Sequence, residues 1–159
     1  MSKHTLIDAL LARARHDLGK AREAAAAAEA GARDESMKSD GKYDTRGIEA
    51  GYLAGAQSRR VEELQLEIQM LEEIPLRDFR ADEEAAVGAL IDLELNGQVR
   101  SYFLATTAGG TVLTLAGRPV LVISVFSPIG DAVLGLVAGD EFELETASGT
   151  RHHRVVLVR

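Results

Sequence analysis

Residues 33–46, around which the first half of the chain is organised, read RDESMKSDGKYDTR. Long segments of helix-forming residues flank this stretch on both sides. Its serines, glycine and aspartates are poor residues for the interior of a helix. We therefore predict that the chain reverses near Lys38 and that the stretch is the acidic tip of a helical hairpin. The tip acids are Asp34, Glu35, Asp40 and Asp44.

The segment before the tip carries a heptad pattern. Apolar and small residues recur with alternating steps of four and three, the spacing of positions a and d in a coiled coil. These residues are Ile7, Leu11, Ala14, Leu18, Ala21, Ala25, Ala28 and Ala32. The segment after the tip supplies a matching seam of Val61, Leu64, Ile68 and Leu71. Pro75 predicts that this second helix ends near Glu73, because the residue before a proline disfavours helical conformation.

Glycines recur every four residues in the second helix, at Gly47, Gly51 and Gly55, so they share one face. With a reversal near Lys38, this face lies opposite the alanines of residues 24–28. Small residues on both helices would allow close approach, so we predict a hairpin that becomes slim toward its tip. The pattern alone is equally typical of a generic coiled-coil hairpin for dimerisation or adaptor work.

A charged, aperiodic linker is predicted over residues 76–84, and short β-type runs follow it, separated by Gly, Asn or Pro. The run 120–126 is almost entirely apolar, which predicts the most buried strand. Ser127 and Pro128 predict the start of a helix, with the serine as its cap and the proline in its first turn. The predicted strands are 87–95, 98–106, 111–115, 120–126, 141–146 and 151–158.

These patterns predict an α+β chain with two parts. An antiparallel coiled-coil hairpin covers residues 1–75, and an antiparallel sheet domain with one helix covers residues 85–159. The chain of 159 residues has no cysteine and a net charge of −7. The absence of cysteine excludes thiol catalysis and Cys-ligated zinc. The negative net charge argues against the basic surface that direct nucleic-acid binding needs. Without a signal peptide or an apolar run of about 20 residues, a cytoplasmic monomer without membrane contact is expected.

The segment from Ser127 to Asp140 resembles the signature of the C-terminal domain of the Gre-type (GreA/GreB) bacterial transcription elongation factors. The order of parts, a long hairpin before a small sheet domain, is also similar to that family. The resemblance implies an FKBP-like sheet domain that docks on RNA polymerase, and a hairpin that enters the polymerase secondary channel. The residues that carry it, and that form the expected docking region, are Ser127, Pro128, Ile129, Ala132, Gly135, Gly139 and Asp140.

The resemblance also implies a role for the tip. In Gre-type factors, tip carboxylates help to hold a magnesium ion of the polymerase, whose own active site then cleaves backtracked RNA. A protein of this kind is not an enzyme by itself, binds no metal alone and at most shares Mg²⁺ with the polymerase. Asp34, Glu35, Asp40 and Asp44 are the candidate ligands or polymerase contacts.

The tip departs from the family pattern at two positions. Aligned on Tyr43, the key acids of the family fall on Ser36 and Ser39, and a serine hydroxyl is a poor ligand for magnesium. Two functions therefore stay open. One is a factor that occupies the channel and modulates elongation or initiation, and the other is an active stimulator of RNA cleavage.

Two functions of other classes are weaker interpretations. A peptidyl-prolyl isomerase needs an aromatic-lined pocket, and residues 85–159 offer only Tyr102, Phe103, Phe126 and Phe142. A coiled-coil adaptor needs an apolar seam on the outside of the hairpin, which the sequence does not show. His152 and His153 are adjacent in a predicted strand, so they point to opposite faces and cannot share a metal ion.

Overall fold

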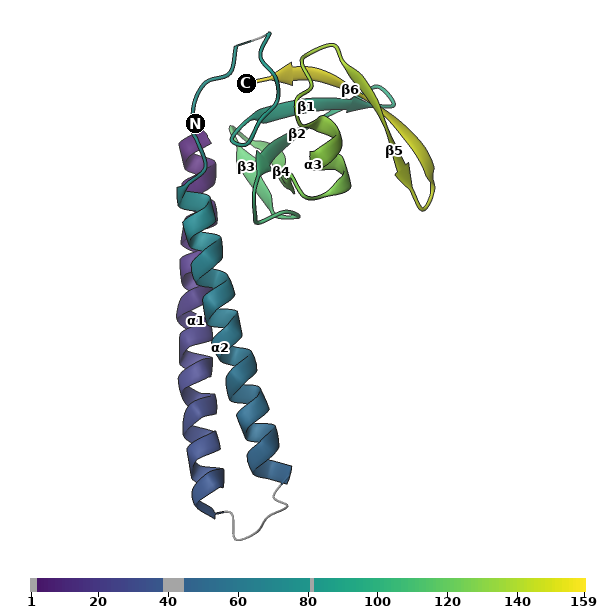
Figure 1. Cartoon of the computed structure of the whole chain (residues 1–159). Coiled ribbons are helices and arrows are strands. Elements are labelled where there is room, and N and C mark those ends of the chain that lie inside the picture. The colour runs from purple at the N-terminus through teal and green to yellow at the C-terminus, as the bar shows by residue number, and fades with distance from the viewer. Residues whose placement is uncertain (1–2, 39–44, 81) are drawn as a thin grey trace. The chain divides into compact units, whose positions relative to one another are not determined.

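The computed structural model describes residues 3–38, 45–80 and 82–159. The described residues form two long helices and then six strands, with a short helix between the fourth and fifth strands (Figure 1). The helices are α1 (Lys3–Lys38), α2 (Thr45–Glu72) and α3 (Pro128–Val133). The strands are β1 (Leu90–Leu95), β2 (Gln98–Ala105), β3 (Val112–Leu115), β4 (Arg118–Ser124), β5 (Glu141–Thr146) and β6 (Gly149–Val158). The predicted fold class is confirmed.

The chain divides into two compact units. The helical unit is Leu11–Gln69, and the sheet unit contains Met70–Arg159 together with the first turns of α1. Among the described residues, no helix combines the length and the apolar character that crossing a bilayer requires.

The predicted heptad seam is confirmed in the helical unit. The seam positions from Leu11 to Ala21 are buried and those from Ala25 to Ala32 are half-buried, whereas most positions between them are exposed. Leu18 and Ala21 pack with Leu64, and partly buried apolar side chains of α2 complete this cluster. Burial of these side chains in one shared seam is what holds the two helices together.

The predicted reversal near Lys38 agrees with the end of α1 at Lys38 and the start of α2 at Thr45, and residues 39–44 between them lie outside the described residues. α1 continues through Asp34 and Ser36, since the Ser36 hydroxyl donates to the carbonyl of Arg33 at 2.8 Å and is thereby satisfied within the helix. The observed pairing of residues along the seam differs from the pairing that a reversal at Lys38 predicts. A reversal centred on Lys38 would place Leu64 opposite Ala12, but Leu64 packs with Leu18 and Ala21, about two turns further along α1.

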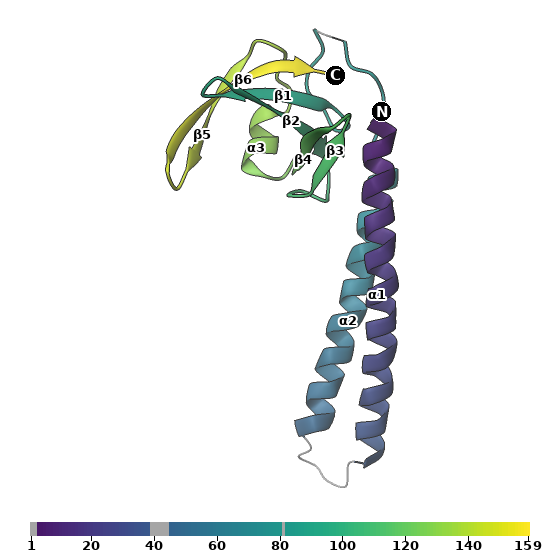
Figure 2. The same cartoon turned by 180° about the vertical axis from the view of Figure 1, so that it is seen from behind.

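The prediction of a slim hairpin is wrong at the two glycines for which surrounding space is described. A Cβ atom built on Gly51 meets no atom within 4 Å, and one on Gly55 meets only the guanidinium of Arg59, at 4.0 Å. Figures 1 and 2 both show α1 and α2 separating toward the ends at Lys38 and Thr45. These glycines therefore do not serve close packing of the two helices.

The sheet has the strand order β3-β4-β2-β1-β6-β5. The prediction of an entirely antiparallel sheet is wrong for one pair, because β2 and β4 are parallel. The chain passes from β2 to the edge strand β3 and turns back at Ala116–Gly117, so β4 enters between β3 and β2 in the direction of β2. The predicted turn at Asn96–Gly97 is confirmed, with φ values of 53° and 76° in the left-handed region that a two-residue hairpin loop requires.

One face of the sheet packs against α3 to form the core of the sheet unit. Val133 of α3 is fully buried and belongs to the same cluster as Ile91, Leu104 and Val155. Three residues of β4 are buried, but the prediction that it is the most buried strand is wrong, because β2 has four consecutive buried residues. The strand also ends at Ser124, and Phe126 is 79% exposed instead of buried. The apolar run 120–126 therefore combines a core strand with an exposed aromatic side chain.

Candidate functional site

The tip acids are only partly described. Asp34 is exposed and Glu35 is half-buried on the last turns of α1, whereas Asp40 and Asp44 lie outside the described residues. Acids near a helix C-terminus interact unfavourably with the helix dipole, so helix stability does not account for Asp34 and Glu35. The gathering of four carboxylates at the tip stays a prediction.

The motif that begins at Ser127 builds the turn from β4 into α3. The Gly130 amide donates to the Ser127 hydroxyl at 3.2 Å, and that hydroxyl donates to the Ser124 carbonyl at 2.6 Å. Pro128 occupies the first turn of α3, where a missing N–H group has no cost. The predicted cap is confirmed, and it fixes the direction in which the chain leaves the sheet.

Gly130 is a residue of this turn that the sequence analysis missed. A Cβ atom at this position would lie 1.9 Å from the carbonyl oxygen of Ser124, so only glycine fits. The close approach brings α3 against the end of β4. The glycine two residues after Pro128 was a visible signal, but the sequence does not reveal that backbone atoms crowd it.

The second half of the motif builds the turn from α3 into β5. Gly135 and Gly139 have φ values of 82° and 99°, which other residues rarely adopt. The Asp140 carboxylate accepts a hydrogen bond from the Val137 amide at 2.9 Å, and Ala132 is half-buried. The Asp140 carbonyl accepts from the amide of Val155 in β6 at 2.8 Å. These motif residues position the surrounding surface and do not offer free side chains to a partner.

The side chains that the motif leaves accessible are apolar. Phe126 is 79% exposed, Pro128 is exposed and Ile129 is half-buried. Phe126 and Ile129 line a hollow of about 600 Å³ together with Leu121 and residues 106–110.

A second hollow extends this apolar surface. It has a volume of about 540 Å³, shares Leu121 with the first and adds Val99 and Val112, which are 55% and 63% exposed. Charged side chains, those of Asp92, Arg100 and Arg118, also line it. We call the surface formed by Phe126, Ile129, Leu121, Val112 and Val99 the apolar face. Neither valine was predicted from the sequence, and for Val112 the reason is that local alternation does not show that β3 is an edge strand.

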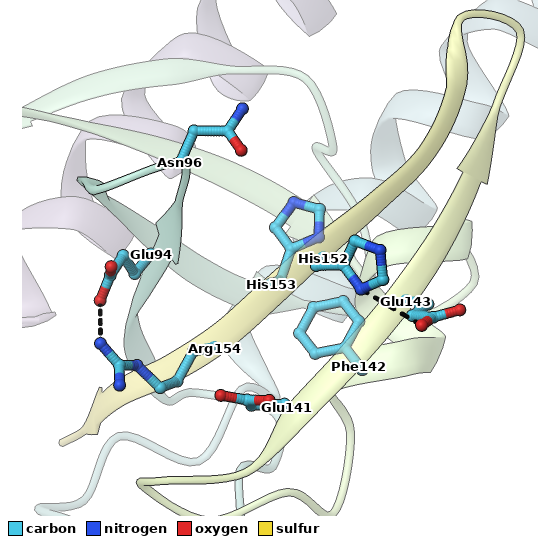
Figure 3. A pocket seen from close by; sticks show the side chains of 8 residues that line it. All are labelled: Glu94, Asn96, Glu141, Phe142, Glu143, His152, His153 and Arg154. Atoms are coloured by element: carbon cyan, nitrogen blue, oxygen red, sulfur yellow. Dashed lines mark hydrogen bonds and ion pairs between the residues drawn. The ribbon is translucent and has the colours of Figure 1, made fainter.

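A polar hollow of about 310 Å³ lies over the β5–β6 hairpin (Figure 3). Arg154 pairs with Glu94 at 2.5 Å, and Nδ1 of His152 lies 3.2 Å from the Glu143 carboxylate. The rings of Phe142 and His153 stack with their centroids 5.0 Å apart.

The two histidines lie on opposite faces of the hairpin, as predicted. His152 is exposed and His153 is buried. Burial lowers the pKa of His153, an effect that the backbone carbonyl of Arg151 partly offsets and the charge of Arg151 reinforces. Within the described ranges, no group of three or more His, Cys, Asp or Glu side chains is arranged to hold a metal ion.

Comparison with known proteins identifies the family. No family model matches the chain. Over 130 residues, the chain is 33% identical to the transcription inhibitor protein Gfh1 of Thermus thermophilus, covering 78% of this chain and 77% of that protein. Gfh1 is GreA factor homolog 1. The chain belongs to the Gre family of transcription factors.

Further relatives of this Gre-family chain include the transcription elongation factor GreA of Thermomicrobium roseum. That protein is 29% identical over 124 residues, which cover 77% of this chain and 72% of GreA. Among solved structures, Gfh1 of Thermus aquaticus is 26% identical, with a TM-score of 0.42 over 96% of this chain and 95% of that one. The family assignment rests on the sequence match with the Thermus thermophilus protein.

Proposed function

We propose that this Gre-family chain binds bacterial RNA polymerase, places its hairpin tip in the secondary channel and lowers the rate of transcription. Two relatives support a role in transcription, one named a transcription inhibitor and the other a transcription elongation factor. The relative above 30% identity is the inhibitor, which favours inhibition as the direction. In this proposal the chain has no catalytic site of its own and acts on the active site of the polymerase.

Ser36 is the observation that favours modulation over stimulated RNA cleavage. It stands where the family resemblance expects a carboxylate, and its hydroxyl is already bonded to the Arg33 carbonyl on the same helix. Glu35 is one residue away, and on a helix this turns its side chain by about 100°. A neutral, occupied hydroxyl adds neither charge nor a strong ligand for Mg²⁺.

The apolar face supports the docking part of the proposal. Exposed aromatic side chains beside apolar hollows are typical of the centres of protein–protein interfaces. Phe126 directly precedes the family motif, and the hydrogen bonds of Ser127 and Asp140 hold the backbone on both sides of α3. We propose that Phe126, Ile129 and Val112 contact an apolar surface of the polymerase.

Docking is tested by titrating labelled full-length protein with bacterial RNA polymerase and measuring fluorescence anisotropy. Phe126→Ser is expected to weaken binding at least about tenfold and Val112→Ser about threefold, because each removes buried apolar area from the complex. Val156→Ser is the matched control, since Val156 is an exposed strand valine outside the two apolar hollows. Equal affinities for all four proteins would remove the apolar face from the proposal.

Stimulated RNA cleavage is the alternative function, with Asp34, Glu35, Asp40 and Asp44 as ligands of a magnesium ion shared with the polymerase. It is tested on backtracked polymerase complexes with wild type and with Asp34→Asn/Glu35→Gln and Asp40→Ala/Asp44→Ala. The proposal expects binding without release of short RNA. Release of short RNA that either double variant abolishes would establish cleavage instead.

A further inference from the structure

The sheet unit contains a hollow of about 550 Å³ whose cationic side chains have no role in the proposed function, although it shares Ser101 and Arg118 with the second hollow of the apolar face. Lys3, Arg118 and Arg159 line it, and Asp78 is the one acidic residue among the lining residues. The sequence as a whole carries a net charge of −7, so this local excess of cations runs against the overall balance. The volume falls within the range of about 300–1,000 Å³ that is usual for small-molecule sites.

Lys3 is the buried cation of this hollow. Its side chain is only 9% exposed, its ammonium donates to the Arg77 carbonyl, and it lies 4.7 Å from the centroid of the Phe79 ring. Burial lowers the pKa of Lys3, the charge of Asp78 opposes this effect, and the charges of Arg77 and Arg159 add to it. The charge of Glu83 also opposes the effect, so burial is the main cause of the lowered pKa of Lys3.

The two arginines differ in how they are held. Arg159 pairs with the Asp92 carboxylate at 3.5 Å, and the Ser101 hydroxyl donates to the same carboxylate at 2.6 Å. Arg159 is also fixed through its backbone, which exchanges hydrogen bonds of 2.8 and 2.9 Å with Leu90. Arg118 makes no side-chain hydrogen bond or ion pair with the part of the chain that the structure describes, so its guanidinium is available.

The start of α1 adds to the positive potential. Lys3 is the first residue of this 36-residue helix, and the first turn has no acidic side chain. Aligned peptide dipoles place a partial positive charge at such a helix end. The helix end and the three cationic side chains therefore favour the same kind of ligand.

We propose that this hollow binds a small phosphate-bearing anion, of the size of pyrophosphate or a nucleotide. Arg118 supplies a planar pair of donors for phosphate oxygens, Arg159 a second guanidinium, and Lys3 a buried point charge. The net charge of −7 opposes a long polyanion, which restricts the ligand to an anion that fits within the hollow. The proposal does not depend on binding to RNA polymerase.

The first test is calorimetric titration of the full-length chain with sodium pyrophosphate, with sodium chloride added to keep the ionic strength constant. Wild type is expected to bind saturably at one site, and Arg118→Gln to weaken binding at least about tenfold. Arg100→Gln is the matched control, because it removes the same charge from an exposed arginine of β2 that does not line this hollow. It is expected to change affinity less than about twofold.

The second test keeps the fold unchanged and observes Lys3 directly. The sequence has four lysines, Lys3, Lys20, Lys38 and Lys42, so ¹³C-dimethylated side chains give a small set of assignable NMR signals. Pyrophosphate is expected to raise the pKa of Lys3 and to leave the NMR signals of Lys20 unchanged. No saturable binding, equal weakening by Arg118→Gln and Arg100→Gln, or equal shifts at Lys3 and Lys20 would overturn the proposal.

Discussion

Glycine has opposite roles in the two units of this chain. In the sheet unit, a Cβ atom on Gly88 would lie 2.2 Å from the carbonyl oxygen of Pro75, and one on Gly130 would lie 1.9 Å from that of Ser124. In the helical unit, a Cβ atom on Gly51 would meet nothing within 4 Å. At Gly88 and Gly130 the sheet unit needs glycine for close backbone contacts, whereas at Gly51 the helical unit gains no packing from it.

The largest expected effect is that of Gly130→Ala. The added methyl group overlaps a backbone oxygen that cannot move without breaking the turn between β4 and α3, so we expect a loss of about 3 kcal/mol or more. Urea unfolding followed by circular dichroism measures it, with Gly19→Ala, where a Cβ atom meets nothing within 4 Å, as the control. A loss below about 0.5 kcal/mol would show that the two units do not differ in this way.

Gly51→Ala is expected to change stability in the opposite direction. Alanine has a higher helix propensity than glycine by about 1 kcal/mol, and the space for its methyl group is open. The melting temperature of the helical unit should therefore rise. A fall in that temperature would mean that Gly51 packs closely against α1 after all and would restore the slim hairpin predicted from the sequence.

The smallest expected effect is a loss of stability of the sheet unit at acidic pH. Because burial lowers the pKa of His153, the unfolded chain binds more protons than the folded chain just below pH 6.5. The stability of the sheet unit should therefore fall as the pH drops from about 6.5 toward 5, by less than about 1 kcal/mol. His153→Phe keeps a ring stacked on Phe142 and should flatten this slope. An identical slope in wild type and variant would exclude His153 as its source.

The sequence predicted the features that depend on local pattern. The heptad seam from Leu11 to Ala32 and the cap at Ser127 were both confirmed, since each follows from the spacing of a few neighbouring residues. The six predicted strands each correspond to an observed strand, with bounds that differ by up to three residues.

The features that depend on contacts between residues far apart in the sequence could not be predicted from local patterns. The exposure of Phe126, the crowding of Gly130 by Ser124 and the parallel pairing of β2 with β4 arise from tertiary packing. The continuation of α1 through Ser36 depended on a side-chain bond to Arg33 that competes with helix-breaking propensity. The apolar face combines these non-local features, so it was only partly visible in the sequence.

The most direct test of the proposed function is the rate of RNA extension by bacterial RNA polymerase in the presence of increasing amounts of the full-length chain. The account predicts that the rate falls to a plateau, that Phe126→Ser shifts the half-maximal concentration upward by about tenfold, and that Val156→Ser does not. An extension rate that is unchanged at concentrations of the chain well above that of the polymerase would contradict it.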